Sequence, residues 1–322
     1  MKFRTTMLTL LTLALATCSA RAEDASDYPS RKIKMLLPFA AGGGGDVIGR
    51  LLADKMGRRM GQTIYVENRT GAAGTIGTQM VATSPADGYT IMIGGMTTHI
   101  LAPASYASLP YDSIKDFAVI GRIGTSAILV VASKDFPAND LRGLIAMAKK
   151  DDQIQYGSWG VGSTGHFCAE ILSQKAGIRL QHVPFSGAAK VANDLIGGHI
   201  SLGTLDMATA TPLVKDGKLK ALGTCGDRSP SLPDVASYKE QGIDFERSLS
   251  WVMYAPAGIP DIAAKKLSAA LKESIAEADM TERLLALGVT ADFIPGQRQR
   301  DINASDIEAW KVVAKEAKIE IK

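Results

Sequence analysis

Short apolar runs alternate with longer amphipathic segments along most of the chain. The run IKMLLPF at residues 33–39 leads into the glycine-rich stretch AAGGGGD and then into VIGRLLADKMGRRMG. This last segment places its apolar positions on one helical face, with Asp46 as the expected N-cap. The order of strand, turn and helix recurs at TIYVEN, RTGAAG and TIGTQMVA. Such alternation predicts an α/β fold built around mostly parallel sheets.

A second series of strands and helices begins near Ala127. It starts with ILVVAS, LRGLIAMAKK and IQYGS and continues through LQHVPF and ISLGTL to KLKALGT. Two series predict two lobes, each a mostly parallel sheet flanked by helices, with crossings near Ser126 and Cys225. We therefore assign residues 23–126 and 226–322 to lobe 1 and residues 127–225 to lobe 2.

The part of the chain that follows the second crossing contains two further helix-like segments, at residues 263–276 and 306–317. Ser305 and Glu308 have the spacing of a capping box, which predicts that the last helix begins at Asp306. We expect this tail to pack back on lobe 1.

The first 22 residues have the organisation of a secretory signal peptide. Lys2 and Arg4 form a basic start, residues 7–17 are apolar, and Ala-Arg-Ala at residues 20–22 is a cleavage site. The apolar run has about half of the ~20 residues that a membrane-spanning helix needs, so a permanent anchor is the weaker alternative. Cys18 leaves acylation as a lipoprotein as another alternative, although Thr17 is not the small residue typical before such a cysteine. We expect an exported protein.

Charge and cysteine content restrict the possible partners. The full chain has 36 basic and 33 acidic residues, and the signal segment carries three of the basic ones and no acid, so the mature chain is formally neutral. Neutrality gives no reason to expect nucleic acid or an anionic membrane as partner. Cys168 and Cys225 could form a disulfide in an oxidising compartment, but we expect two unpaired cysteines, because sequence alone does not bring their Cα atoms within ~7 Å. No cluster has metal-ligand spacing, so no metal or other cofactor is expected.

The stretch GSWGVGSTGHF contains Gly160, Gly162 and Gly165 in the spacing G-x-G-x-x-G. A dinucleotide site also needs an acidic residue about 20 positions later, and the next strand, LQHVPF, has none. AAGGGGD lacks the Lys-Ser/Thr pair of a phosphate loop. What remains is a property of the backbone, because glycine turns before helices expose N–H groups that attract anions.

Four turns of this type occur, at residues 40–46, 69–75, 158–164 and 186–188. For any single turn, tight packing at a strand end is the alternative. The set, in a neutral chain with two lobes, predicts a small carboxylate held between the lobes.

A series of motifs, in order along residues 28–322, resembles the substrate-binding receptors of tripartite tricarboxylate transporters, the Bug family. They are YPSRKIKMLLPFAAGGGGD, VENRTGAAGTIGT, ADGYTIMIG, LPYDSIKDFAVI, YGSWGVGSTGHF, HVPFSGAAK, DGKLKALGT, RSPSLPDV and YAPAGIP. The resemblance implies a type II-like periplasmic binding protein that is monomeric and non-enzymatic, closes on a small organic acid, and delivers it to membrane subunits of a transporter.

In this family, backbone groups and waters at two turns hold one ligand carboxylate, and the matching positions here are residues 39–46 and 158–166. The first turn departs from the usual PFPPGGGTD pattern, because Ala40, Ala41 and Gly45 replace bulkier choices. The expected consequence is either a roomier pocket or a more mobile loop. A dicarboxylate, aliphatic or aromatic, is the first expectation for the ligand, and a terephthalate-like acid would suit a roomier turn.

The candidate ligand-binding residues lie in these turns and at two neighbouring strand ends. They are Phe39, Ala41, Gly42, Gly43, Asp46, Thr97, Thr98, Ser158, Gly160, Gly162, Ser163, Thr164, His166, Ser186, Gly187 and Asp206. Ser163 could instead only cap its helix, and His166 could be a packed neutral histidine. His99 is expected at an edge. Asp206 resembles an acidic position at the cleft of this family, which implies that it holds a water or a ligand amine or hydroxyl. Direct contact with the acid end is not expected, because an aspartate would repel a carboxylate.

Two other functions fit parts of the pattern. Ser158 and His166, eight residues apart, would suit an α/β hydrolase, but the chain has no G-x-S-x-G elbow and no acid partner can be assigned. A sensory receptor that presents the closed lobes to a signalling protein needs the same binding and closure as a transport receptor.

Overall fold

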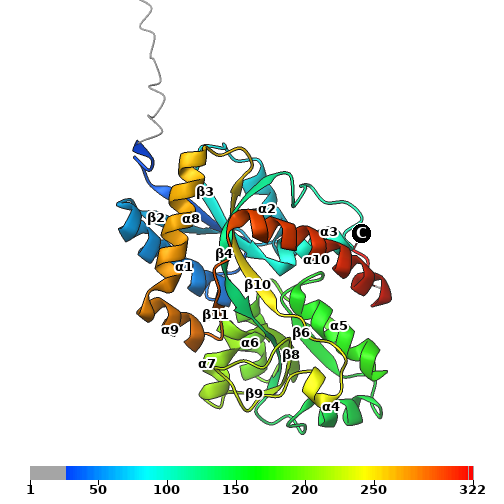
Figure 1. Ribbon diagram of the computed structural model, residues 1–322. Coiled ribbons are helices and arrows are strands. Elements are labelled where there is room, and N and C mark those ends of the chain that lie inside the picture. Colours follow the sequence, from blue (N-terminus) through cyan, green and yellow to red (C-terminus); the bar gives the residue numbers. More distant parts are fainter. Residues whose placement is uncertain (1–26, 318, 322) are drawn as a thin grey trace, which may run out of the picture.

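The computed structural model describes residues 27–317 and 319–321, and within them the chain forms two β-sheets with helices packed around each. We call each sheet with its helices a lobe; Figure 1 shows lobe 1 above lobe 2. The two-sheet α/β architecture predicted from the sequence is confirmed. The predicted signal peptide at residues 1–22, with Cys18, lies outside the described residues.

Sheet 1 has the strand order β11-β4-β10-β3-β1-β2. Its strands are β1 (Ile33–Leu37), β2 (Ile64–Asn68), β3 (Thr90–Gly95), β4 (Phe117–Ser126), β10 (Leu249–Pro256) and β11 (Thr290–Ala291). The helices of this lobe are α1 (Gly44–Met60), α2 (Thr75–Ala82), α3 (Ala102–Ser105), α8 (Asp261–Ala276), α9 (Ala278–Ala286) and α10 (Gly296–Glu316), with the short turns η2 (Ala72–Gly74) and η3 (Met96–Leu101).

Sheet 2 has the order β7-β6-β8-β5-β9. Its strands are β5 (Ile128–Ser133), β6 (Gln155–Ser158), β7 (Gln181–Pro184), β8 (Leu202–Asp206) and β9 (Leu219–Cys225). The helices are α4 (Leu141–Ala148), α5 (Thr164–Ala176), α6 (Ala188–Ile196) and α7 (Met207–Lys215), and η4 (Lys239–Gln241) lies in the connection that follows β9.

Each sheet is mixed, whereas the sequence indicated mostly parallel sheets. β1 is parallel to β2 and β3, and β6 is parallel to β7 and β8. β5 pairs antiparallel with β8 and β9, β10 with β3 and β4, and β11 with β4. β5 and β10 are the first strands after the two crossings, and they run against the direction that strand-helix-strand units impose.

The apolar stripe predicted for α1 is buried, but the cap is not where the sequence placed it. Ile48, Leu52 and Met56 are inaccessible to solvent. The N-cap is Gly43, and Asp46 lies in the first turn. The Asp46 carboxylate accepts hydrogen bonds from Gly42 N at 3.0 Å and from the Arg50 and Asn68 side chains, so it braces the glycine turn from inside the helix.

The last helix begins at Gly296 rather than at Asp306, so the predicted capping box of Ser305 and Glu308 lies inside α10. Gln299 and Asn303 are buried on the same face as Ile307 and Trp310. Gln299 donates to Asn303 at 2.8 Å, and Asn303 donates to the Tyr254 hydroxyl at 3.0 Å. Polar residues therefore occupy the first two turns of the buried face, so a search for apolar positions does not recognise this part of the helix.

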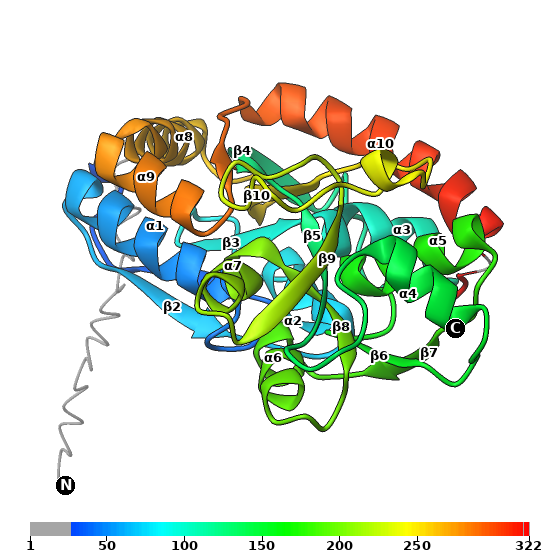
Figure 2. The ribbon, with the colours of Figure 1, turned by 90° about the horizontal axis from the view of Figure 1, so that it is seen from below.

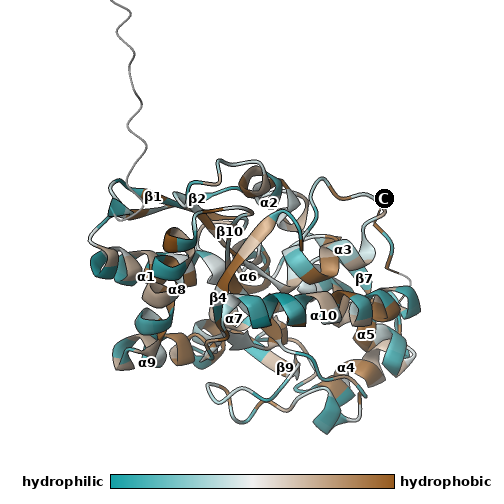
Figure 3. Ribbon diagram, turned by 45° about the horizontal axis from the view of Figure 1, so that its top comes forward, coloured by the Kyte–Doolittle hydropathy of each residue, from teal (hydrophilic) through white to brown (hydrophobic). Residues whose placement is uncertain are grey.

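The inner strands and outer helices differ in polarity, as layered packing requires. In Figure 3, hydrophobic stretches lie on the inner strands around β4 and β10, whereas much of α10 is hydrophilic. None of the helices in the described ranges has both the length and the apolar character to cross a membrane.

Candidate functional site

A cavity of about 470 Å³ lies between the two lobes. The four glycine-containing turns singled out in the sequence line it, two from lobe 1 (residues 38–40 with 43–45, and 70–74) and two from lobe 2 (residues 159–161 and 185–188). The end of β3 with the start of η3 and the start of β10 complete most of the remaining wall. The cavity is thus built at the carboxyl ends of β1, β2, β3, β6 and β7, where α/β sheets usually hold ligands.

Several backbone N–H groups of these turns have no acceptor within residues 27–317 and 319–321. Those in the cavity wall include the amides of Gly45, Ala72, Ala73, Val161 and Ala188. Gly45 lies in the first turn of α1 and Ala188 is the first residue of α6, so helix dipoles add to the partial positive charge there. Gly45 and Ala188 are buried, so their amides need an acceptor, whereas Ala72 and Val161 are exposed. As a group, these donors fit an anion or the waters around one.

The side chains that line the cavity carry little charge. Among the described residues, no Lys, Arg or His lines it, and Asp206 is its one carboxyl group. Aromatic side chains from both lobes contribute apolar surface: Phe39, Tyr106, Trp159, Phe185 and Trp251. The cavity therefore combines an apolar wall with donors supplied mainly by the backbone.

Asp206 caps α7 with its carboxylate. Oδ1 accepts from Thr209 N at 3.0 Å and Oδ2 from the Thr209 hydroxyl at 2.8 Å, while Thr209 Oγ1 accepts from Gly44 N at 2.9 Å. Burial raises the pKa of Asp206, against the effect of these hydrogen bonds. The Gly44 to Thr209 bond also joins the start of α1 in lobe 1 to the start of α7 in lobe 2.

The predicted site residues divide into two groups. Those that line the cavity are Phe39, Gly43, Thr97, Gly160, Ser186, Gly187 and Asp206. Those that lie behind or beside its wall are Ala41, Gly42, Asp46, Thr98, Ser158, Gly162, Ser163, Thr164 and His166.

Ser158 and Ser163, expected to contact ligand, are fully buried in a network beneath the turn. Ser163 is the N-cap of α5 and accepts from His166 N at 3.2 Å. Ser158 Oγ lies 2.6 Å from His182 Nε2 and accepts from Gly160 N at 3.3 Å. The two hydroxyls brace the turn, and Ser158 is not an exposed nucleophile.

His166 belongs to the same brace. Its Nδ1 accepts from Gly162 N at 3.2 Å, and its ring stacks on His182 with centroids 4.2 Å apart. Burial, with the neighbouring His182, lowers the pKa of His166 to about 3, and burial lowers the pKa of His182 to about 4. Both rings are therefore neutral near pH 7, and a neutral Nδ1 is what the Gly162 amide requires as acceptor.

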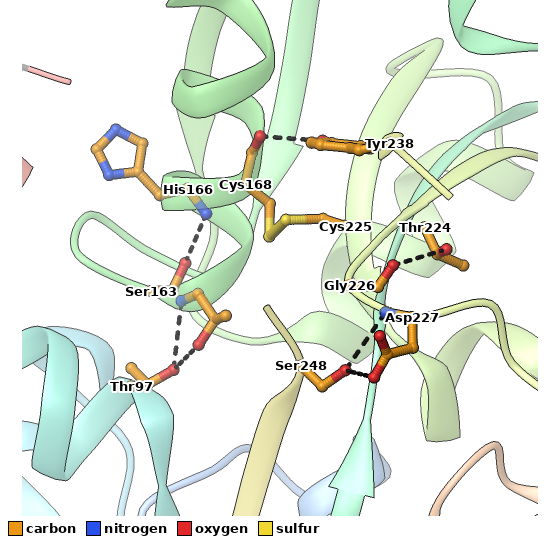
Figure 4. Close-up of a disulfide and its surroundings, with 11 residues drawn as sticks. Thr97, Ser163, His166, Cys168, Thr224, Cys225, Gly226, Asp227, Tyr238 and Ser248 are labelled. Atoms are coloured by element: carbon orange, nitrogen blue, oxygen red, sulfur yellow. Dashed lines mark hydrogen bonds between the residues drawn. A yellow bond between two sulfur atoms is a disulfide. The ribbon is translucent and has the colours of Figure 1, made fainter. Parts of the chain in front are cut away.

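Thr97 and Thr164 join the two lobes beside the cavity. Their hydroxyl oxygens lie 2.7 Å apart, and Thr164 N donates to Thr97 Oγ1 at 3.3 Å. Figure 4 shows Thr97 facing the start of α5. His99, expected at an edge, is instead completely buried and stacks on Tyr254 with centroids 3.6 Å apart.

Cys168 and Cys225 form a disulfide, so the expectation of two unpaired cysteines is wrong. Their Cα atoms are 5.9 Å apart, which the 57-residue separation in sequence gave no means of predicting. The bond ties α5 to the end of β9, and the Tyr238 hydroxyl donates to Cys168 O at 2.9 Å on the same side (Figure 4). The helix that follows the glycine turn of residues 158–164 is thereby fixed to the strand at the second crossing.

Several cavity residues were not identified from the sequence. Trp159 and Phe185 stand inside the glycine turns GSWGVG and HVPFSG, so their position beside the predicted site was a usable signal. Tyr106 and Ile321 had no such signal, because neither belongs to a turn that precedes a helix. In the described part of the chain, no three His, Cys, Asp or Glu side chains are grouped so that they could hold a metal ion.

Comparison with known sequences places most of the chain among one group of receptors. A family model described as "Tripartite tricarboxylate transporter family receptor" matches residues 48–319. A UPF0065 protein from the tcbD-tcbE intergenic region of Pseudomonas sp. strain P51 is 32% identical over 313 residues, which are 96% of this chain and 93% of the relative. Protein BugT of Bordetella pertussis is 28% identical over 323 residues, 99% of each chain.

Solved structures agree with the sequence matches. The periplasmic binding protein BugD superposes with a TM-score of 0.88 at 32% identity, covering 92% of this chain and 100% of the other. An R. palustris protein with adipate gives 0.88 at 28% identity over 92% and 100% of the two chains. MatC of Rhodopseudomonas palustris with bound malate gives 0.83 at 29% identity over 89% and 99%.

Proposed function

The chain belongs to the tripartite tricarboxylate transporter receptor family, a family of non-catalytic solute-binding receptors, and we propose that it captures a small dicarboxylate. In this proposal the acid is held between the two lobes in the periplasm, and the closed receptor delivers it to the membrane subunits of such a transporter. The receptor acts as a monomer and uses no cofactor.

The observation that carries the proposal is the group of unpartnered amides around the cavity. Gly45, Ala72, Ala73, Val161 and Ala188 come from all four turns, and each presents an N–H without a protein acceptor in the described ranges. A carboxylate is acceptor-only and can take several such bonds, each worth about 1.5–3 kcal/mol when the acceptor is charged. Sugars and cations lack this match.

A dicarboxylate, aliphatic or aromatic, fits the distribution of polar and apolar surface. Turns at opposite sides of the cavity offer two groups of donors, and aromatic side chains such as Trp159 and Trp251 offer apolar contact to whatever links the acid groups. The proteins solved with adipate and with malate are relatives of this chain with the same fold. Asp206 faces the same space and disfavours a third carboxylate beside it.

The proposal is tested by a thermal-shift screen with mono-, di- and tricarboxylates, amino acids and sugars. A ligand at ~100 times its dissociation constant stabilises a protein by about 2.7 kcal/mol, so a dicarboxylate should raise the melting temperature. If amino acids or sugars raise it and no carboxylate does, the proposal is wrong. Small-angle scattering should also show a smaller radius of gyration with saturating ligand, as hinge closure requires.

The role of the amides has a direct test at Ala188. Proline is tolerated at the first position of a helix, and Gly187 before it is already extended, with φ 164° and ψ 157°. Ala188→Pro therefore removes one donor while α6 remains. Binding should weaken about ten- to a hundredfold with little change in melting temperature. Gly162→Pro is a poorer probe, because the Gly162 amide already donates to His166.

A sensory receptor remains the second candidate, because closure on an acid serves either partner. Deleting the gene should abolish uptake of the identified ligand if the receptor serves a transporter. Normal uptake with a lost transcriptional or chemotactic response would favour the sensory function.

A further inference from the structure

The segment that follows α10 contributes to the cavity wall. Ile321 N donates to Ser105 O at 2.8 Å, and Ala107 N donates to Ile321 O at 2.9 Å, so residue 321 forms a parallel bridge beside Tyr106. Figure 2 shows the end of α10 beside α5 and close to the loops of lobe 2. The backbone of this segment is thus fixed by hydrogen bonds at the edge of the site.

The Ile321 side chain fills a space that a glycine leaves open. Ile321 and Tyr106 both line the cavity. A Cβ atom at Gly162 would lie 2.4 Å from Ile321 Cδ1 and 3.1 Å from Tyr106 Cε2. Three separate segments therefore meet at this wall, and the two side chains of lobe 1 occupy the room beside the turn of lobe 2.

Contacts on α10 hold the segment against both lobes. Gln174 Nε2, on α5, donates to Glu316 O at 2.6 Å, and the rings of Phe167 and Trp310 meet edge to face at 5.7 Å. Ile319, two residues before Ile321, is buried and its amide donates to Ala314 O at 2.9 Å. These contacts fix the position of Ile321 in the cavity wall.

The wall formed by Ile321 and Tyr106 is mainly apolar. The isoleucine side chain has no polar atom, and the Tyr106 hydroxyl donates to Ala72 O at 3.4 Å. Burial raises the pKa of Tyr106, so this phenol stays neutral. Such a surface suits the hydrocarbon part of a ligand, whereas its carboxylates belong at the amides of the turns.

We propose that Ile321 is a specificity-determining residue, whose side chain limits the size of the hydrocarbon part that the receptor accepts. The inference rests on the proposed function and deepens it, because it assigns ligand size to a residue outside all four turns. A larger space at position 321 admits longer acids, and a smaller one excludes them.

The test uses linear α,ω-dicarboxylates from succinate to suberate, with dissociation constants measured by calorimetry for the mature protein and for Ile321→Ala and Ile321→Phe. Ile321→Ala should favour a longer acid than the wild type does, and Ile321→Phe a shorter one. When the pocket gains or loses room for one methylene group of the ligand, the ratio of the dissociation constants of two acids that differ by that group should change about tenfold or more. Ile321→Val, which removes a single methyl group, replaces Ile321→Ala if that variant does not fold.

Ile319→Ala is the matched control. It removes the same atoms as Ile321→Ala, but from a side chain two residues earlier that does not line the cavity. It should lower the melting temperature and leave the preferred chain length unchanged. If the wild type binds acids of the series and the Ile321 variants keep its preference, or if Ile319→Ala shifts it equally, the inference is overturned and the proposed function stands. If the wild type binds no carboxylate at all, both the proposed function and the inference are wrong.

Discussion

The Cβ atom of Ala40 lies 2.5 Å from the place that a Cβ atom at Gly187 would occupy. Ala40 belongs to the first turn of lobe 1, and Gly187 precedes α6 in lobe 2. The φ angle of 164° at Gly187 is extended and open to any residue. Glycine is therefore needed at this position because the opposite lobe approaches it.

Gly187→Ala should weaken ligand binding by preventing full closure. Overpacking typically costs about 1–3 kcal/mol, which raises the dissociation constant about five- to a hundredfold. The melting temperature without ligand should change little, because an open cleft accommodates the new methyl group. The sharpest control is Ala40→Gly in the same chain, which exchanges the two side chains and should restore binding. No recovery in the exchanged pair would mean that the contact between Ala40 and Gly187 does not govern closure.

The hydroxyl pair of Thr97 and Thr164 should contribute to affinity in a way that depends on both partners. Thr97→Val leaves both the hydroxyl and the backbone amide of Thr164 without their partner, whereas Thr164→Val leaves the Thr97 hydroxyl with the Thr164 amide as its donor. Thr97→Val should raise the dissociation constant by about tenfold, Thr164→Val by less, and the double variant by about as much as Thr97→Val alone. Thr98→Val is the control, since Thr98 bonds to its neighbour His99 within lobe 1. Additive losses in the double variant would contradict this coupling.

Removing the disulfide should destabilise the protein. Cys168 and Cys225 are 57 residues apart, and closing a loop of that length in the unfolded chain corresponds to about 4 kcal/mol. The Cys168→Ala/Cys225→Ala variant should therefore lose free energy of unfolding of this order in urea titrations. Unfolding the wild type in the presence of a reductant should reproduce the loss, and the variant itself should not respond to reductant. If the reductant does not change the free energy of unfolding of the wild type, the assignment of a disulfide between Cys168 and Cys225 is wrong.

Acid should destabilise the brace beneath the ligand turn. The pKa of His166 is about 3 in the folded chain against an ordinary value of 6.5, so between these values the unfolded chain binds a proton that the folded chain does not. The neutral ring contributes fully above pH 6.5, and stability is lost as the pH falls from 6.5 towards 3. Urea unfolding at pH 7.5, 6 and 5 should show a shallower decline for His166→Gln than for the wild type. His199→Gln, at an exposed site, should follow the wild type; equal slopes for all three would show that His166 is not responsible.

Much of the site follows from features that are local in sequence. A strand, a glycine turn and a helix are encoded within some twenty neighbouring residues, and parallel strands bring their carboxyl ends to one edge. For this reason the four turns, with Gly160 and Gly187 in them, could be placed around one cavity before the structure was known. Their relation to the helices was also visible in outline, although Gly43 rather than Asp46 caps α1.

Features that depend on distant segments escaped prediction. Cys168 and Cys225 are adjacent because α5 packs on sheet 2. No pattern of neighbouring residues in the sequence gives the distance between their Cα atoms. Ser158 looked available for a ligand, since the sequence does not show that His182, on the neighbouring strand, already occupies its hydroxyl. The start of α10 was missed for a related reason, because its buried Asn303 finds its partner in Tyr254 on β10.

The position of β10 between β3 and β4 also determines the order in which the molecule can be assembled. A chain is synthesised from its N-terminus, so β3 and β4 are made early. They cannot be joined in one sheet until β10 is made, and β10 follows all the strands of sheet 2 in sequence. Sheet 2 draws β5 to β9 from one continuous stretch and is complete sooner. The wall at Ile321 and Tyr106 is the last part of the cavity to form. A chain whose synthesis has not reached this segment therefore has an incomplete cavity, however far its second lobe has folded.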